Sequence, residues 1–350
     1  MEDYREMIDG DLTSILKSVS RTLYLSINIL PAKVRALMAM GYLLCRALDT
    51  VTDCQGPDNA LKREILAISR RLGDKKYHPE LVEKIKRVAA FVPGTGEKKL
   101  LLNFNKLLSV YLSFPAADRL MLDFVCDGVA HGMEMDVETF AGPGLASFKT
   151  EEELRKYCGY IGGAPGVFWA RLYRDTIRQN NALAVKFPSE DSANALGSAL
   201  QIINILKDMS ADLKCGRCYL PQSDLSAVNM KPEDLLDPAN MKRLKGTVYK
   251  WVAWALDQLD TSESFVSSIP KTELSLRAAV IWPVYWGMDT LEKIAVANLL
   301  DPAGRPRIKR NRIYTTILST PPLLLSNTAF SMGYRFRRET LMVALNTVIR

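Results

Sequence analysis

The sequence predicts an all-α protein that folds as one domain over residues 1–350. Apolar residues recur with the spacing of amphipathic helices along the whole chain, whereas the alternation typical of half-buried strands is scarce. Clusters of glycine and proline, such as Pro93–Gly96 and Pro302–Gly304, indicate loops between these segments. No change of composition and no flexible linker marks a domain boundary, so a single helical bundle is expected.

The composition is that of an ordinary globular protein with a basic surface. Hydrophobic residues fill 48% of the 350 positions and charged residues 24%, a balance typical of chains with a substantial core. The formal charge of +7 favours anionic partners such as phosphorylated substrates or acidic lipid headgroups. Nucleic acid is not an expected partner, because basic runs interleaved with aromatic residues are not evident before the C-terminal region.

The N-terminus and the cysteines indicate a cytoplasmic protein. Residues 1–11 are acidic and polar, so no signal peptide is expected. Of the six cysteines, only Cys215 and Cys218 have a CxxC spacing, and no second CxxC or nearby histidine completes a zinc site. We therefore expect reduced, mostly buried thiols.

A first helical segment, residues 35–53, carries a narrow polar stripe. Tyr42, Arg46, Asp49 and Asp53 follow one another at steps of four, three and four, which places them on one face of a helix. The other faces are apolar. Such a stripe is typical of a helix that lines a polar cavity or of one that is half exposed to water.

A second segment, residues 193–213, repeats this pattern. Gln201, Asn204, Asp208 and Asp212 form its stripe among leucine and isoleucine residues, and Lys207 lies beside it. In both segments the two aspartates are four residues apart.

The paired carboxylates predict a divalent cation. Two like charges at this spacing repel by about 0.2–0.5 kcal/mol even when exposed. A solvated helix face is the competing interpretation, because the spacing is common and recurs at Asp123 and Asp127. The arginine of the first stripe and the amides of the second favour a metal–phosphate site instead. Mg²⁺ takes carboxylates together with phosphate oxygens, and such ions neutralise the charge that develops on a departing diphosphate.

The C-terminal region contains an uncharged stretch, residues 313–334, that is 22 positions long. Basic residues flank it on both sides: Arg305, Arg307, Lys309, Arg310 and Arg312 before it, and Arg335, Arg337 and Arg338 after it. The length suffices to span a bilayer, but Pro321 and Pro322 interrupt it and eight positions are Ser, Thr or Asn. We expect a buried helical hairpin or an interfacial segment on acidic lipid, that is, peripheral membrane contact.

Several motifs together resemble the signatures of the squalene and phytoene synthases. Ser20-Arg21 and YLLCRALDTVTD (Tyr42–Asp53) are similar to the family's first motif, and YCGYIGGAPG (Tyr157–Gly166) to its tyrosine motif. QIINILKDMSAD (Gln201–Asp212), followed by GRCYLP (Gly216–Pro221), is similar to its second aspartate motif. The motifs occur in the family's order, and a weaker likeness continues to about residue 310.

The resemblance implies an all-α isoprenoid (trans-prenyl) synthase fold around a central cavity. It implies the head-to-head condensation of two prenyl diphosphates through a cyclopropyl intermediate. The implied Mg²⁺ ligands are Asp49, Asp53, Asp208 and Asp212. The implied groups at the substrate diphosphate and the metal are Arg21, Arg46, Gln201, Asn204, Lys207 and Arg217. The implied catalytic residues are Tyr160, Arg46 and Tyr42.

Three positions depart from the family's pattern. Cys54 stands where relatives commonly have another acid, and Gly159 stands where they frequently have histidine. Lys207 replaces the usual arginine, which keeps the charge but loses the bidentate fork of a guanidinium.

The Leu48-Asp49-Thr50 form of the first motif is closer to the squalene-forming members of the family. This implies that two farnesyl diphosphates are joined to presqualene diphosphate, which NADPH then reduces, with Lys309 and Arg310 near the nucleotide phosphate. One alternative is a dehydrosqualene, phytoene or presqualene diphosphate synthase without the reductive step. The other is a non-catalytic helical protein that binds prenyl lipids, in which Cys54 reflects lost metal binding. Substrate chain length and oligomeric state stay open.

Overall fold

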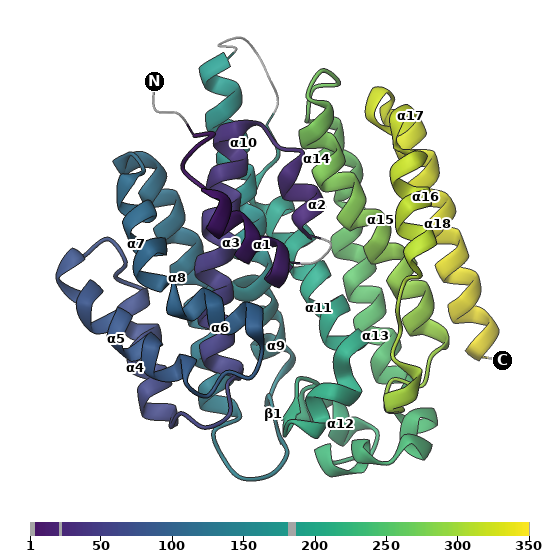
Figure 1. Ribbon diagram of the computed structural model, residues 1–350. Helices are drawn as coiled ribbons and strands as arrows, with labels where there is room; N and C mark the ends of the chain where they lie inside the picture. Colours follow the sequence, from purple (N-terminus) through teal and green to yellow (C-terminus); the bar gives the residue numbers. More distant parts are fainter. Residues whose placement is uncertain (1–3, 21–22, 181–186, 350) are drawn as a thin grey trace. The chain divides into compact units, whose positions relative to one another are not determined.

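The computed structural model describes residues 4–20, 23–180 and 187–349 (Figure 1). Nearly all of its regular structure is helical, which confirms the predicted all-α class. Within these ranges the strands are one short parallel pair, in which Ala146 and Ser147 of β1 (Ala146–Ser147) pair with Arg217 and Cys218 of β2 (Arg217–Cys218). The chain divides into two compact units, and the single domain over 1–350 stays a prediction.

The first unit comprises Met1–Glu138 and Val167–Leu183. Its helices are α1 (Gly10–Ser20), α2 (Leu23–Asn28), α3 (Ala32–Asp53), α4 (Asn59–Ser69), η1 (Lys75–Tyr77), α5 (His78–Ala89), α6 (Thr95–Leu102), α7 (Phe104–Ser113), α8 (Ala116–Thr139) and most of α10 (Ala164–Asn180). α3 contributes an apolar face to the core, with Leu37, Met40 and Leu43 fully buried. The helix ends where Cys54 turns to an extended backbone, and Asp58 then caps α4 by accepting from the Leu61 N–H at 2.7 Å.

The second unit comprises Thr139–Gly166 and Ala184–Arg350. Its helices are α9 (Glu151–Cys158), the π-helix η2 (Gly159–Gly163), the first turn of α10, α11 (Glu190–Lys214), α12 (Gln222–Ala227), η3 (Pro232–Leu236), η4 (Pro238–Asn240), α13 (Met241–Asp260), α14 (Ser262–Ser267), α15 (Leu274–Val296), η5 (Pro302–Gly304), α16 (Arg310–Leu318), α17 (Thr320–Leu325) and α18 (Asn327–Ile349). Thr150 and Glu153 form a capping box at the start of α9, and Ser189 caps α11.

The uncharged C-terminal stretch is divided among α16, α17 and α18. Pro321 and Pro322 lie in the first turn of α17, where proline is tolerated because the first N–H groups of a helix have no partner within it. This confirms that the two prolines interrupt the stretch. In the described parts of the chain, no helix has both the length and the apolar character needed to cross a bilayer.

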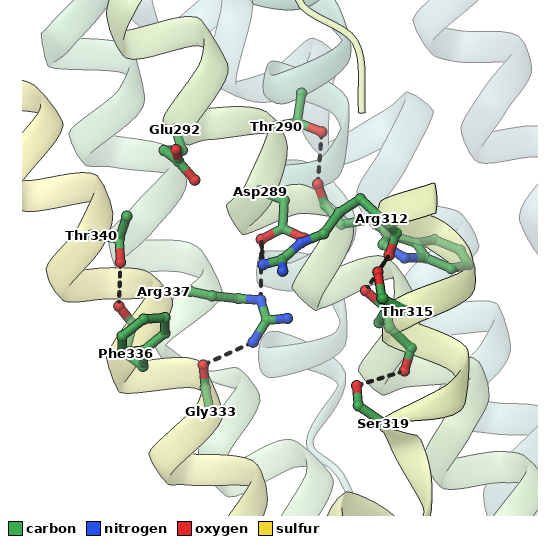
Figure 2. Close-up of polar contacts among 12 residues, drawn as sticks. Asp289, Thr290, Glu292, Arg312, Thr315, Ser319, Gly333, Phe336, Arg337 and Thr340 are labelled. Atoms are coloured by element: carbon green, nitrogen blue, oxygen red, sulfur yellow. Dashed lines mark hydrogen bonds and ion pairs between the residues drawn. The ribbon is translucent and has the colours of Figure 1, made fainter. Parts of the chain in front are cut away.

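The carboxylate of Asp289 joins α15 to α16 and α18 (Figure 2). Asp289 is 5% exposed, and Arg312 of α16 donates to both of its oxygens at 2.7 Å. Arg337 of α18 donates to the same carboxylate at 3.2 Å and lies 3.9 Å from the centroid of the Tyr285 ring. One buried carboxylate thus binds two arginines from two helices, with the bidentate geometry that makes such pairs strong.

We expect Asp289→Asn to lower the free energy of unfolding by about 3 kcal/mol, because it leaves the largely buried guanidinium of Arg337 and the more exposed one of Arg312 without their carboxylate. Urea unfolding followed by circular dichroism measures the change. Glu292→Gln is the matched control on α15, since Glu292 pairs with the exposed Lys293 and should matter by less than about 1 kcal/mol. Equal effects of the two substitutions would contradict the role of Asp289.

Candidate active site

The predicted stripe of the first segment lies on α3. Tyr42, Arg46 and Asp49 are half-buried, and Asp53 is exposed at the last residue of the helix. The Tyr42 hydroxyl donates to the carbonyl of Val19 at 2.8 Å, which fixes the ring against α1. The guanidinium of Arg46 forms an ion pair with Asp49 one turn further along.

Arg46 has a second carboxylate partner that the sequence does not predict. Glu97, in the first turn of α6, accepts from Arg46 at 3.0 Å. Burial alone lowers the pKa of Arg46, but the carboxylates of Asp49 and Glu97 raise it on balance, so the charge is firmly held. The first aspartate pair therefore has one neighbouring cation within its own helix.

Cys54 follows this pair directly. The residue is 7% exposed, and burial raises the pKa of its thiol. A neutral thiol offers a hard cation neither a negative charge nor an oxygen ligand.

The predicted stripe of the second segment lies on α11. Gln201, Lys207 and Asp208 are half-buried and Asn204 is exposed. The Lys207 ammonium donates to the side-chain oxygen of Asn204 at 2.8 Å and lies 3.7 Å from Asp208. A second cation also contacts Asp208, because Arg305 donates to it through Nε at 2.7 Å.

Asp212 and Arg217 line a small cavity between the C-terminal half of α11 and residues 217–220. The cavity has a volume of about 10 Å³, about the space of one water molecule. The chain turns back at Gly216, which has φ +80° and accepts a hydrogen bond from the Ala146 N–H at 3.1 Å. This turn and the β1–β2 pair place Arg217 beside the second aspartate of the stripe.

The middle of the tyrosine motif, Gly159–Gly163, forms the π-helix η2, which packs directly on α11. A Cβ built on Gly197 would lie 2.0 Å from the Gly162 carbonyl oxygen, and one built on Gly162 would lie 2.2 Å from that of Gly197. Only glycine permits this contact between backbones. π-Helical turns inside α-helices occur frequently at functional sites. Here the turn carries the half-buried Tyr160, whereas Tyr157 is buried and stacks on Tyr219 with ring centroids 5.2 Å apart.

The third aspartate pair, on α8, forms ordinary structural contacts. The Tyr111 hydroxyl donates to Asp123 at 2.5 Å, and desolvation raises the pKa of this carboxyl. Asp127 pairs with Arg70 at 2.9 Å. The solvated or structural interpretation of the spacing therefore applies to this copy.

The structure does not test the predicted roles of three basic residues. Lys309 and Arg310 are exposed at the start of α16, and Arg21 lies outside the described residues. Their predicted roles stay predictions.

A magnesium site stays a prediction as well. Asp49 and Asp53 belong to the first unit, and Asp208 and Asp212 belong to the second. Among the described residues, no three His, Cys, Asp or Glu side chains are grouped so as to hold a metal ion. The chemistry of the donors fits Mg²⁺, since each pair offers carboxylate oxygens and no soft ligand.

Comparisons with known proteins agree with the sequence motifs. The profile of the family described as squalene/phytoene synthase matches residues 16–312. A bifunctional lycopene cyclase/phytoene synthase of Pyrenophora tritici-repentis is 28% identical over 66% of this chain and 37% of its own length. A 15-cis-phytoene synthase of Enterobacter agglomerans is 25% identical over 77% of this chain and 78% of its own. A squalene synthase of Schizosaccharomyces pombe is 24% identical over 74% of this chain, which spans about half of that relative.

Solved structures share the fold. The complex of TcSQS with BPH1237 superposes with a TM-score of 0.72 at 21% identity, over 97% of this chain and 99% of the other. A dehydrosqualene synthase superposes with a TM-score of 0.59 at 18% identity, over 95% and 98% of the two chains. This similarity confirms the predicted isoprenoid synthase fold.

We expect Gly197→Ala to destabilise the protein by about 1–3 kcal/mol, because the new methyl group forces η2 away from α11. Gly246→Ala is the matched control, since nothing lies within 4 Å of its Cβ position inside α13 and alanine should stabilise the helix by up to about 1 kcal/mol. Chemical unfolding of both variants measures the change in the free energy of unfolding, which should be a loss for Gly197→Ala and a gain for Gly246→Ala. Destabilisation by both, or by neither, would contradict the close packing of η2.

Proposed function

Because the chain belongs to the squalene/phytoene synthase family, we propose that it condenses two prenyl diphosphates head to head and releases diphosphate. The observation that carries this proposal is the family match over residues 16–312 together with two half-buried aspartates, Asp49 and Asp208, that each contact an arginine. A polar stripe on an otherwise apolar helix is compatible with a wall that lines a polar cavity.

In this proposal the four aspartates of α3 and α11 would hold Mg²⁺, which would supply positive charge against the leaving diphosphate. Arg46, Lys207 and Arg217 donate to phosphate oxygens, and the fixed positive charge stabilises the diphosphate as the carbon–oxygen bond breaks. Gln201 and Asn204 donate or accept at the metal-bound groups. Arg21 belongs to the same set by its place in the motif.

The tyrosines act on the carbon side of the reaction. Tyr42 offers an aromatic face beside the first aspartate pair, and such a face stabilises a nearby carbocation. Tyr160 transfers a proton or contacts the diphosphate through its hydroxyl. Apolar side chains at such a site would exclude water, which would otherwise capture the carbocation.

The product we propose is squalene, made from farnesyl diphosphate by way of presqualene diphosphate and reduction by NADPH. The Leu48-Asp49-Thr50 sequence supports this choice, and the exposed Lys309 and Arg310 offer positive charge to a nucleotide phosphate. Phytoene or dehydrosqualene is the second candidate, since the relatives at 28% and 25% identity are described as phytoene synthases.

Incubation of the purified protein with farnesyl diphosphate and Mg²⁺, with and without NADPH, tests both steps. We expect diphosphate release under both conditions, and squalene by mass spectrometry only with NADPH. Asp49→Asn and Asp208→Asn should each lower diphosphate release at least 100-fold, because each removes a charged metal ligand. Asp127→Asn is the control from the structural pair and should retain the activity.

Products that do not depend on NADPH would exclude the reductive step and favour the second candidate. Full activity of the Asp49 and Asp208 variants, or release that is indifferent to Mg²⁺, would contradict the proposed condensation. The non-catalytic prenyl-lipid-binding protein would then be the remaining interpretation.

We also propose that α16–α18 contact acidic lipid. Large apolar side chains on these helices are strongly exposed: Tyr314 59%, Leu318 79%, Leu325 61%, Met332 68%, Phe336 67% and Val343 64%. The exposed Lys309, Arg310 and Arg335 on the same helices and their flank complement anionic headgroups. Apolar side chains flanked by cations are typical of an interfacial segment, and the product proposed above is itself apolar.

We expect the double substitution Leu318→Ser, Phe336→Ser to lower binding to phosphatidylserine-containing vesicles at least tenfold, because it removes two exposed apolar side chains. Cosedimentation with vesicles measures the bound fraction. Leu120→Ser is the control, since Leu120 is equally exposed, at 70%, on α8. Equal binding of the double variant and the control would contradict a lipid-facing role of α16–α18.

A further inference from the structure

Arg305 is the closest cation to the first aspartate of the α11 stripe. It contacts Asp208 through both Nε and Nη2, with Nε at 2.7 Å. Both side chains keep some access to solvent, about 33% for Arg305 and 26% for Asp208. The two residues are 97 positions apart, so the contact is tertiary rather than a feature of one helix.

The loop that carries Arg305 is held in place by its own hydrogen bonds. Asp301 caps η5 by accepting from the Ala303 N–H at 2.9 Å, and Asn298 donates to the Pro238 carbonyl at 3.0 Å. Pro306, which follows Arg305, is buried. These contacts hold the segments on either side of Arg305, so its guanidinium could change partners by side-chain rotation alone.

A basic cavity of about 470 Å³ lies beside this ion pair. Its lining includes Lys214, Arg305 and Arg307, together with Ser210 and Ala211 of α11. Three cations around one open space attract an anion, and arginine binds phosphate oxygens with two parallel hydrogen bonds. The cavity is large enough for a diphosphate group, and Arg305 in its lining contacts the carboxylate of Asp208.

We propose that Arg305 is a positioning residue that binds Asp208 while no divalent cation is present and turns to a diphosphate oxygen once the cation replaces it. This inference rests on the proposed function, since it takes Asp208 as a Mg²⁺ ligand. A guanidinium and Mg²⁺ compete for the same carboxylate oxygens. A guanidinium displaced from Asp208 would still line the basic cavity, where a bound diphosphate would offer it phosphate oxygens.

If Mg²⁺ and Arg305 compete for Asp208, removing Arg305 should change the affinities for Mg²⁺ and for diphosphate in opposite directions. Without Arg305 the cation no longer displaces a partner from Asp208, so Mg²⁺ binding in the absence of diphosphate should become about two- to fivefold tighter, the range of a partly exposed ion pair. Inorganic diphosphate loses a bidentate partner, so its binding to the Mg²⁺-loaded protein should become about tenfold weaker. A purely structural arginine would not strengthen one affinity while weakening the other.

Isothermal titration of the purified full chain with Mg²⁺, and then with inorganic diphosphate, measures both affinities for the wild type, Arg305→Gln and Arg305→Lys. Arg305→Lys should restore part of the diphosphate affinity, because it keeps the charge. Thermal unfolding shows whether each variant is folded. Arg307→Gln is the matched control: it removes one charge from the same cavity but leaves the Asp208 contact, so it should weaken diphosphate binding only.

The outcomes separate the inference from the function on which it rests. If Asp208→Asn does not change Mg²⁺ binding, the proposed metal site itself fails. If Asp208→Asn weakens Mg²⁺ binding but Arg305→Gln does not strengthen it, or strengthens it no more than Arg307→Gln, the exchange of partners is overturned. Loss of NADP⁺ binding with unchanged diphosphate binding in Arg305→Gln would assign the cavity to a nucleotide phosphate and overturn the proposal.

Discussion

The repulsion between carboxylates on one helix face is the constraint on which the rest of the candidate site depends. A half-buried carboxylate beside another carboxylate is stabilised by a neighbouring cation, which offsets both the repulsion and the lost hydration. In this protein an arginine is that cation at both stripes: Arg46 contacts Asp49, and Arg305 contacts Asp208. The same guanidinium groups are suited to phosphate, so the charges that stabilise the resting protein are also those that an anionic substrate requires.

The packing of η2 on α11 adds a geometric constraint. Glycines at both sides let the two backbones touch, so no side chain separates the π-helical turn from α11. Tyr160 and the polar stripe of α11 are thereby held on adjoining elements of one unit. A site built on paired helices keeps its geometry better than one built on loops, which suits a reaction that must exclude water.

The sequence patterns predicted those features that depend on residues close together in the chain. The helical class, both stripes and the interruption at Pro321 all follow from spacing or from the chemistry of proline. The partners Glu97 and Arg305 lie 51 and 97 residues from the arginine and aspartate that they contact, and no periodicity connects such positions. The two-residue strands are too short to alternate, so they left no signal either.

The contacts of Asp289 with Arg312 and Arg337 extend beyond the segment that matches the family profile. The profile match ends at residue 312, and that residue is itself one of the two arginines on Asp289. The remainder of the chain covers α15, since Phe330 stacks on Tyr285 and Thr320 accepts from Trp282. A protein trimmed to the segment that matches the family profile would therefore expose aromatic side chains of α15, which residues 313–349 cover in the full chain.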